Sequence, residues 1–500
     1  MPRFMGVPLR TQRFAPRQRG HNPGGAGSNV VVHRPRLTPE WAPSRNDMTT
    51  RAQGKARQGK RGGAGTPKKT PVQPVYFLSL TLENVRCFGP KQTLRLSNNQ
   101  GRPAQWTVIL GNNGIGKTTL LQALTSFEPA RLVSDQHVFY LPKAHRLEWA
   151  PVRHQADKAR LAVAVMGGRP IEDDGQEQHA DLMYEVKPGG NGFTCTGYFE
   201  PFHHLMCYGY GATRRMGAGS LSAPKESQSS DSLFFEDVPL RNAEEWLLQA
   251  DYAASKESTE QGSAKAKRER IKQLLVELLP EVSDLRFAPP DSSHAAARVE
   301  IQTPYGWVEM RDLSLGYRTL IAWMVDLASR LFERYPESAN PLAEPAVVLV
   351  DEIDLHLHPT WQRQLIGYLT ERFPNTQFIV TAHSPLVVQS ATDANIVVLK
   401  REGDHVVIDN DVESIRGWRV DQILTSDLFG LETARPPQIE EFLTERTALL
   451  SKPRLTARDE ARLRELESAI GPLPTGETKT EREALELIRR AAERLGDDRK

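Results

Sequence analysis

Gly111-Asn-Asn-Gly-Ile-Gly-Lys-Thr118 is the stretch that decides the fold of this 500-residue chain. It fits the pattern G-x-x-x-x-G-K-[ST], in which backbone N–H groups and the N-terminus of the next helix bind the phosphates of a nucleotide. Such a loop needs a buried strand before it and a helix after it. The apolar run Trp106-Thr-Val-Ile-Leu110 precedes it, and the helix-prone residues 119–124 follow. We therefore predict a nucleotide-binding α/β domain.

The phosphate loop supplies most of the ligands expected for ATP. Lys117 is expected to neutralise the β- and γ-phosphates, and Thr118 is expected to ligate Mg²⁺. The nucleotide-binding residues predicted in this segment are Gly111, Asn112, Asn113, Gly114, Ile115, Gly116, Lys117, Thr118 and Thr119.

Two carboxylates follow a second apolar run. Ala346-Val-Val-Leu-Val350 shows no alternation, which is typical of a strand buried on both faces of a parallel sheet. Asp351 and Glu352 come at its carboxyl end, where such sheets present ligand sites. Asp351 is expected to hold Mg²⁺, and Glu352 to act as the general base on the attacking water. The pair therefore predicts hydrolysis in addition to binding.

Two more segments place polar groups where they can meet a phosphate. Gln377-Phe-Ile-Val-Thr381 is expected to be a third strand, after which His383 can donate a hydrogen bond to the γ-phosphate. Leu313-Ser-Leu-Gly-Tyr-Arg318 opens a strongly helical stretch, so Ser314 and Gly316 offer N–H donors, a hydroxyl and a positive dipole end to an anion. The alternative is that Ser314 is an ordinary N-cap.

These four motifs, in this order, resemble the ABC-type ATPase heads of the SMC, Rad50 and RecF kind. The resemblance implies an α/β P-loop fold with a mixed sheet flanked by helices. It also implies that Ser314 and Gly316 contact the γ-phosphate held by a second subunit, and that Asp354 lies at the seam of the dimer. Arg86, at the end of Leu80-Thr-Leu-Glu-Asn-Val-Arg86, would lie near the nucleotide base. The active site would then be composite and closed only in an ATP-bound dimer or higher oligomer.

Further segments narrow this resemblance. Asp351-Glu-Ile-Asp-Leu-His-Leu-His-Pro-Thr-Trp-Gln362, Tyr208-Gly-Tyr-Gly-Ala-Thr-Arg-Arg215 and Gly417-Trp-Arg-Val-Asp-Gln-Ile-Leu424 are similar to bacterial anti-phage ATPases of the Septu and retron kind. Those ATPases work with a separate HNH nuclease, so the resemblance implies that this chain regulates such a subunit. The alternative is an ATPase like RecF or Rad50 that acts in DNA double-strand-break repair. Arg214 and Arg215 fit a contact to phosphate or DNA, or a solvated pair after a Gly-rich turn.

Several other functions are disfavoured. An SMC or Rad50 protein with long coiled-coil arms is disfavoured, because Lys117 and Ser314 are 197 residues apart and the residues between them show no sustained heptads. A nuclease site at residues 402–411 is also disfavoured, because this segment reads as two short strands joined by a turn. His356 and His358 are expected to pack beside the phosphate site and not to bind zinc. A transporter ATPase is the least favoured class.

Charge and composition divide the chain into regions. Residues 1–70 carry 15 Lys and Arg against 2 Asp and Glu, whereas residues 71–500 carry 49 against 60. We expect a disordered basic tail over residues 1–74, with nucleic-acid binding as one possible role and a later start at Met48 as another explanation. The ATPase head is expected over residues 75–430, with a helical insertion at about 239–289, and a C-terminal helical docking region over 431–500. A nucleotide-sensing Gln is expected at Gln136 or Gln155.

The chain is expected to be cytoplasmic. No segment approaches the ~18 consecutive apolar residues of a membrane span, and the first 30 residues lack the apolar core of a secretory signal. The three cysteines, Cys87, Cys195 and Cys207, show no metal-binding spacing and are expected to be packing residues of a protein in a reducing compartment.

Overall fold

The fold is seen in a computed structural model of the chain. It describes residues 74–134, 137–142, 152–167, 178–187, 193–196, 204–217, 229–256, 261–279, 281–292, 294–412 and 415–471. Residues 1–73 of the expected basic tail therefore lie outside the described residues. Gln136 lies outside them too, as does the end of the C-terminal region.

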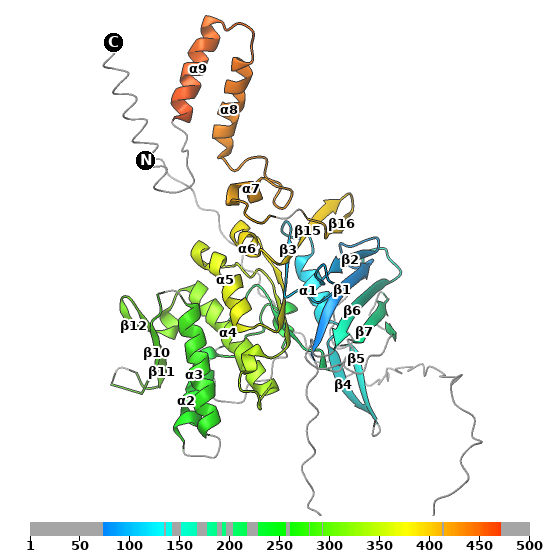
Figure 1. The fold of residues 1–500 in the computed structure, drawn as a ribbon, viewed down its shortest axis with the longest axis vertical. Coiled ribbons are helices and arrows are strands. Elements are labelled where there is room, and N and C mark those ends of the chain that lie inside the picture. Colours follow the sequence, from blue (N-terminus) through cyan, green and yellow to red (C-terminus); the bar gives the residue numbers. More distant parts are fainter. Residues whose placement is uncertain are drawn as a thin grey trace, which may run out of the picture. The chain divides into compact units, whose positions relative to one another are not determined.

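A six-stranded sheet positions the candidate site (Figure 1). Its central strand is β3, and β14 and β15 pair with β3 on either side in parallel register. Beyond β14 come β13 and then β9, both parallel, and β16 closes the other edge antiparallel to β15. The strands, in sheet order, are β16 (His405–Asp409), β15 (Asn395–Glu402), β3 (Trp106–Leu110), β14 (Thr376–Thr381), β13 (Ala346–Val350) and β9 (Cys207–Tyr210).

Both faces of this sheet are buried, as the continuous apolar runs predict. Every residue of β3, β13 and β14 is buried, and alternate side chains enter two different hydrophobic cores. Val108 belongs to the core that contains α4 and α5, whereas Ile109 belongs to the core that contains α1. In the first core Trp106 stacks on Phe378 with ring centroids 4.3 Å apart. Each fully buried apolar side chain of this kind contributes about 1.5–3 kcal/mol.

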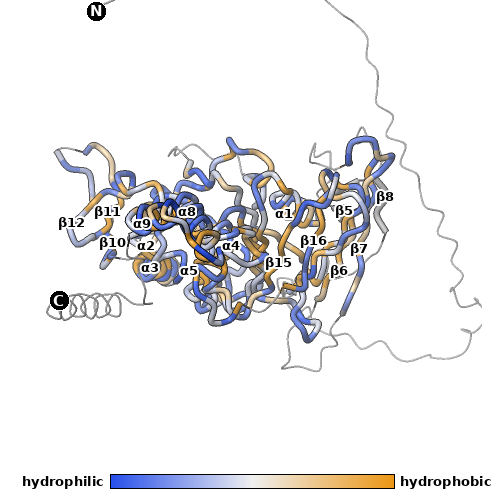
Figure 2. The backbone as a smooth tube through the Cα atoms, turned by 90° about the horizontal axis from the view of Figure 1, so that it is seen from above, coloured by the Kyte–Doolittle hydropathy of each residue, from blue (hydrophilic) through white to orange (hydrophobic). Residues whose placement is uncertain are grey.

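Helices cover both faces of the sheet. On one side lie α4 (Leu315–Arg334) and α5 (Pro359–Arg372), and on the other lies α1 (Lys117–Thr125). The second core also packs against an antiparallel sheet of order β2-β1-β6-β7-β8. Figure 2 shows hydrophobic residues running along β15 and β6, which contribute to this core. The strands are β1 (Val75–Glu83), β2 (Gln92–Arg95), β6 (Ala159–Gly167), β7 (Gln178–Val186) and β8 (Phe193–Thr196), with β4 (Pro129–Ser134) and β5 (His137–Pro142) forming a separate hairpin.

The region expected to be a helical insertion is only partly helical. It holds the paired helices α2 (Ala243–Ser255) and α3 (Gln261–Leu278), which pack through Leu247 and Ile271 into the α4 core. A three-stranded antiparallel sheet follows, made of β10 (Asp284–Ala288), β11 (Arg298–Thr303) and β12 (Gly306–Glu309). Unlike the central strands, β10 and β11 alternate polar and apolar residues, as in Arg298-Val-Glu-Ile-Gln302, and this alternation was the available sequence signal for them.

After the central sheet the chain is helical. The short helices α6 (Pro385–Ser390) and α7 (Val420–Leu424) are followed by α8 (Pro437–Leu450) and α9 (Ala457–Ile470). Thr456 caps α9, because its hydroxyl accepts a hydrogen bond from the backbone N–H of Asp459. None of the helices in the described ranges is long and apolar enough to cross a membrane. The mixed sheet with flanking helices confirms the predicted α/β class.

Candidate functional site

The phosphate loop connects β3 to α1, as predicted. Gly111, Gly114 and Gly116 all have positive φ, and Gly116 forms the N-cap of α1 with a φ of 100°. A Cβ atom at Gly116 would lie 2.4 Å from Sγ of Cys87. The loop therefore requires glycine at this position both for its backbone conformation and for space.

Lys117 lies at the start of α1 with its ammonium folded over the loop. Its Nζ donates hydrogen bonds to the carbonyl oxygens of Gly111 at 2.7 Å and Asn112 at 3.0 Å. Burial lowers the pKa of Lys117, and the charges of the nearby carboxylates oppose this shift. A cation is thus held at the mouth of the loop.

The two residues predicted to hold Mg²⁺ are in direct contact. The hydroxyl of Thr118 donates to Oδ2 of Asp351 at 2.6 Å, and the hydroxyl of Thr381 donates to Oδ1 of the same carboxylate at 2.6 Å. Asp351 is buried, with 5% of its surface exposed. Thr381, at the end of β14, was not singled out in the sequence, because it becomes a neighbour of Asp351 only when β14 pairs with β13.

Glu352 and His383 lie beside this carboxylate. The backbone N–H of Glu352 donates to Oγ1 of Thr381 at 2.7 Å, and Nε2 of His383 lies 3.9 Å from Oε1 of Glu352. The N–H of His383 also donates to Oδ2 of Asp354 at 2.9 Å. About a third of each of the Glu352 and His383 side chains is exposed, so both can reach a ligand.

The sequence did not decide whether Arg214 contacts phosphate or DNA or is exposed to solvent. Its side chain is buried, with 2% exposed, and donates to the carbonyl oxygens of Asp351 at 2.9 Å and Glu352 at 2.8 Å. The reading of Arg214 and Arg215 as a solvated pair is thus wrong for Arg214, whereas Arg215 is exposed. A Gly-rich stretch after a strand at the edge of a parallel sheet was the available signal.

Ser314 does not cap its own helix. It occupies the N-cap position of α4, but its side chain makes no capping hydrogen bond, so the ordinary N-cap alternative is not supported. Gly316 packs closely on the segment after the acidic pair, since a Cβ there would lie 2.3 Å from the carbonyl oxygen of His356. Leu315 is 53% exposed between them. The structure thus brings the start of α4 next to the residues that follow Glu352.

Arg86 lies against α1. Its Nη1 donates to Oε1 of Gln122 at 3.1 Å, and Gln122 in turn donates to the carbonyl oxygen of Leu233 at 2.7 Å. Burial lowers the pKa of Arg86. Its expected place near the nucleotide base stays a prediction. Of the two candidate sensing glutamines, Gln155 is described and has a positive φ of 68°.

The acidic residues at 402–411 are engaged by basic side chains. Asp404 pairs with Arg153 at 2.8 Å, Asp409 with Lys400 at 2.9 Å, and Asp411 with Arg95 at 3.1 Å. Within the described ranges no cluster of three or more His, Cys, Asp or Glu residues could hold a metal ion. These contacts agree with the two-strand interpretation, because β15 and β16 pair through this turn.

His356 and His358 are both exposed, so the expectation that they pack beside the phosphate site is wrong, but His358 makes a structural hydrogen bond. Its Nδ1 accepts a hydrogen bond from the N–H of Thr360 at 3.3 Å and caps α5.

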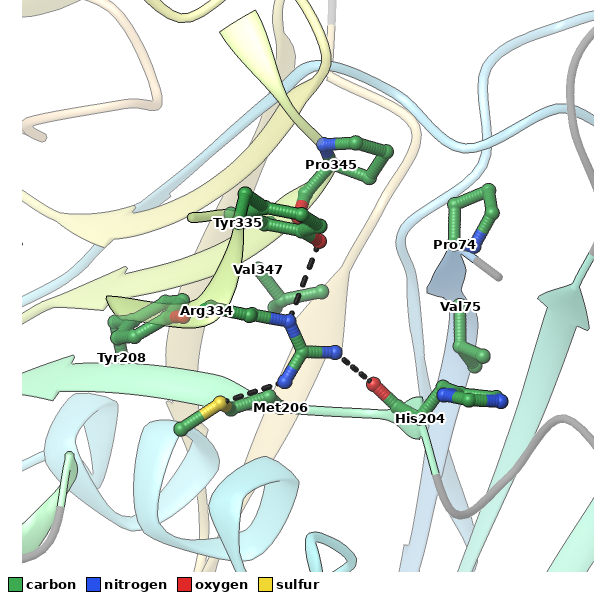
Figure 3. Close-up of a pocket in the computed structure, with 10 residues that line it drawn as sticks. Pro74, Val75, His204, Met206, Tyr208, Arg334, Tyr335, Pro345 and Val347 are labelled. Atoms are coloured by element: carbon green, nitrogen blue, oxygen red, sulfur yellow. Dashed lines mark hydrogen bonds between the residues drawn. The ribbon is translucent and has the colours of Figure 1, made fainter. Parts of the chain in front are cut away.

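A small pocket lies at the opposite edge of the sheet (Figure 3). It is lined by residues at the starts of β1, β9 and β13 and at the end of α4, whereas the acidic pair follows the carboxyl end of β13. In it Arg334 donates to Sδ of Met206 at 2.7 Å and to Oη of Tyr335 at 3.2 Å. Its cavity volume of about 10 Å³ is enough for about one water molecule, so it is not a nucleotide site.

Two known protein families match the segments of the chain that carry the phosphate loop and the acidic pair. Residues 79–127, with the phosphate loop, match the family described as "AAA domain". Residues 210–389, with Arg214, the acidic pair and His383, match the family described as "AAA domain, putative AbiEii toxin, Type IV TA system". The phosphate loop and the acidic pair thus each lie in a segment that is similar to an AAA-domain family.

The chain is similar to two named proteins, a Septu protein and a probable ATPase of a retron. "Septu protein PtuA" of Bacillus mycoides (strain KBAB4) is 27% identical over 394 residues, which cover 76% of this chain and 47% of that protein. "Retron Ec83 probable ATPase" of Escherichia coli is 49% identical over 89 residues, 18% of this chain and 16% of that protein. The chain thus spans about half the length of PtuA. The predicted resemblance to Septu and retron ATPases is confirmed.

Two solved structures are similar to this chain at low identity. The SMC head bound to the C-terminal winged-helix domain of ScpA has 16% identity and a TM-score of 0.39, covering 67% of this chain and 96% of that one. The recombination mediator RecF in its ATPrS complex has 15% identity and a TM-score of 0.37, covering 67% and 98%.

Proposed function

We propose that the protein binds ATP with Mg²⁺ and hydrolyses it to ADP and phosphate. The observation that carries this proposal is the chain of contacts from Thr118 through Asp351 and Thr381 to Glu352. It places a hydroxyl and a carboxylate, the hard oxygen ligands that Mg²⁺ prefers, next to a second and partly exposed carboxylate. The tight fit of the loop glycines and the buried Lys117 suit a phosphate group in the same place.

Each residue then has a distinct role. Bound Mg²⁺ would neutralise charge on the β- and γ-phosphates. Lys117 binds the phosphate oxygens through its ammonium, and the N–H groups of the loop residues 111–119 surround them. Glu352 accepts the proton of the attacking water, and His383 donates a hydrogen bond to the γ-phosphate from a position 3.9 Å from Glu352.

The binding step is tested by removing the cation of the loop. Wild-type protein is expected to bind a fluorescent ATP analogue and to release phosphate, and Lys117→Ala is expected to do neither. Lys91→Ala, which removes an exposed lysine, is the matched control and should behave as wild type. Normal ATP binding and turnover by Lys117→Ala would contradict the proposal.

We further propose that the active site is composite and forms in an ATP-dependent dimer or higher oligomer. Support comes from the start of α4, where the hydroxyl of Ser314 makes no capping bond and Leu315 is exposed beside it. A hydroxyl and N–H donors at a helix start suit an anion, and a second subunit can supply that anion as its bound γ-phosphate. Asp354, close to His383, would lie at the seam.

Mixing two inactive variants tests this arrangement. If sites are shared, Lys117→Ala and Ser314→Arg are each inactive, but a mixture forms some dimers with one intact site. That site combines the phosphate loop of the Ser314→Arg subunit with Ser314 of the Lys117→Ala subunit. Partial recovery of phosphate release on mixing is expected. No recovery, with mixed dimers shown by mass, would contradict a shared site.

We propose anti-phage defence as the setting, with a separate nuclease of the HNH type as the regulated partner. The similarity to PtuA over 76% of this chain supports it. The C-terminal helices α8 and α9 are the proposed docking region for that partner. Cells with this gene and a neighbouring nuclease gene should resist phage, and Lys117→Ala should abolish the resistance. Sensitivity to DNA damage on deletion, without any effect on phage, would favour the repair alternative instead.

A further inference from the structure

A buried guanidinium lies directly behind the acidic pair. Arg214 is four residues beyond the end of β9, which pairs in parallel with β13. The N–H of Asp351 donates to the carbonyl oxygen of Tyr210 at 2.8 Å, so the chain leading to Arg214 is anchored beside Asp351. From there Arg214 binds two successive carbonyl oxygens, those of Asp351 at 2.9 Å and Glu352 at 2.8 Å.

The backbone that Arg214 contacts is in an unusual conformation. Glu352 has a φ of 49°, in the left-handed region that residues other than glycine adopt only when their surroundings hold them there. On one side the hydroxyl of Thr381 accepts the N–H of Glu352 at 2.7 Å. On the other side the guanidinium holds the two carbonyl groups. The peptide units of the acidic pair are therefore fixed from both sides.

The contact depends on the shape of arginine. Two N–H groups of a planar guanidinium reach two carbonyl oxygens at once, whereas a lysine ammonium is a single point charge on a flexible stem. Burial lowers the pKa of Arg214 to about 10, against the pull of Asp351, Asp354 and Glu352, so it stays charged at neutral pH. Its charge lies close to the three carboxylates of the site.

We infer that Arg214 is a positioning residue for hydrolysis, which holds Asp351 and Glu352 in the orientation that the reaction needs without touching the nucleotide. This inference rests on the proposed ATPase activity. Within the described residues, the hydrogen bonds of the Arg214 side chain go to the acidic pair and not to the phosphate loop. A change at Arg214 should therefore reduce turnover at the acidic pair more than nucleotide binding by the loop.

The test compares Arg214→Ala and Arg214→Lys with the matched control Arg215→Ala, which removes the exposed neighbouring arginine. Affinity for a fluorescent ATP analogue, kcat, KM and Tm are measured for each. Arg214→Ala should bind the analogue within a few-fold of wild type, while kcat falls by on the order of 10²-fold, as expected for a small displacement of a reacting group. Arg214→Lys should recover part of kcat, and Arg215→Ala should match wild type.

The outcomes are distinguishable. If the wild type hydrolyses ATP and Arg214→Ala has the same kcat, the positioning role is overturned and the ATPase proposal stands. An equal loss of binding and turnover, with a lowered Tm, also overturns it, because it shows a role in folding alone. If Arg214→Ala fails to fold, Arg214→Lys decides: a lower kcat at unchanged KM supports the inference, and an unchanged kcat refutes it. A wild-type protein that hydrolyses no ATP refutes the proposed function and, with it, this inference.

Discussion

The hydroxyl of Thr118 donates a 2.6 Å hydrogen bond to Oδ2 of Asp351, across 233 positions of the sequence. The contact follows from the parallel order β3-β14-β13, which brings the carboxyl ends of β3 and β13 to one edge of the sheet. The strand between them contributes Thr381, which donates to the other oxygen of the same carboxylate. One buried carboxylate thus connects the phosphate loop to the acidic pair.

Asp351→Asn should abolish magnesium-dependent hydrolysis. An amide keeps the size of the side chain but loses the charge that attracts the cation, so phosphate release should fall to background and added Mg²⁺ should not restore it. EDTA should stop the wild type in the same way. Phosphate release is measured across a Mg²⁺ titration, with Asp393→Asn, an exposed carboxylate, as the control. An unchanged Mg²⁺ dependence in Asp351→Asn would show that the metal is held elsewhere.

Gly116→Ala should lose nucleotide binding. The new Cβ would lie 2.4 Å from Sγ of Cys87, at a φ of 100°, so the loop must shift away from its phosphate-binding shape. Calorimetric titration with ATP measures the effect. The matched control is Gly367→Ala in α5, where nothing lies within 4 Å of the new Cβ, and this change should raise stability by about 1 kcal/mol. ATP affinity equal to wild type in Gly116→Ala would contradict the loop geometry.

Asp326→Ala should destabilise the fold. Asp326 is 1% exposed and accepts hydrogen bonds from Oη of Tyr210 at 3.0 Å and Nε of Arg330 at 2.7 Å. Removing it takes away the buried carboxylate that pairs with the guanidinium of Arg330, which costs about 3–5 kcal/mol, whereas Tyr210→Phe should cost about 1 kcal/mol. Urea denaturation measures both. Equal small losses for the two variants would show that the carboxylate is not needed to balance the buried charge.

Helix α9 should lose stability in acid. The hydrogen bond from Nζ of Lys452, and those from the N–H and hydroxyl of Thr456, hold the pKa of Asp459 well below its usual range. Because the pKa of this carboxyl is lower in the folded than in the unfolded protein, its ionised form stabilises the fold, and this contribution is complete above the unfolded pKa. The contribution is lost as the pH falls through the folded pKa. The protection factors of α9 amides, which correct for the pH dependence of intrinsic exchange, should therefore fall in acid. Asp459→Asn should lack this pH dependence; the same acid response in both proteins would argue against the cap.

Much of the site could be predicted because its signals are local. The loop Gly111–Thr118 and the apolar runs ending at Leu110 and Val350 each specify a strand end and its polar groups without knowledge of distant residues. Every residue of β3 and β13 is buried, which confirms the prediction of buried strands made from those apolar runs. The roles assigned to Glu352 and His383 stay predictions that the contact distances support.

The remaining features depend on long-range packing. The double contact of Arg214 arises from the pairing of β9 with β13, and a pair of arginines after a Gly-rich stretch gives no sign of which one is buried. The hydroxyl of Thr381 became a partner of Asp351 only through the adjacency of β14 and β13. In the same way, only the side-chain geometry shows that Ser314 makes no capping hydrogen bond, and its role as a ligand stays a prediction.

Glu352→Gln is the variant that tests the central claim, hydrolysis by the acidic pair, most directly. Phosphate release and mass by light scattering are measured together at saturating ATP and Mg²⁺, with the wild type alongside. The account predicts that the variant binds ATP, releases phosphate at a background rate, and accumulates as an ATP-dependent dimer or higher oligomer. Phosphate release at the wild-type rate would contradict it, because another group would then have to activate the water.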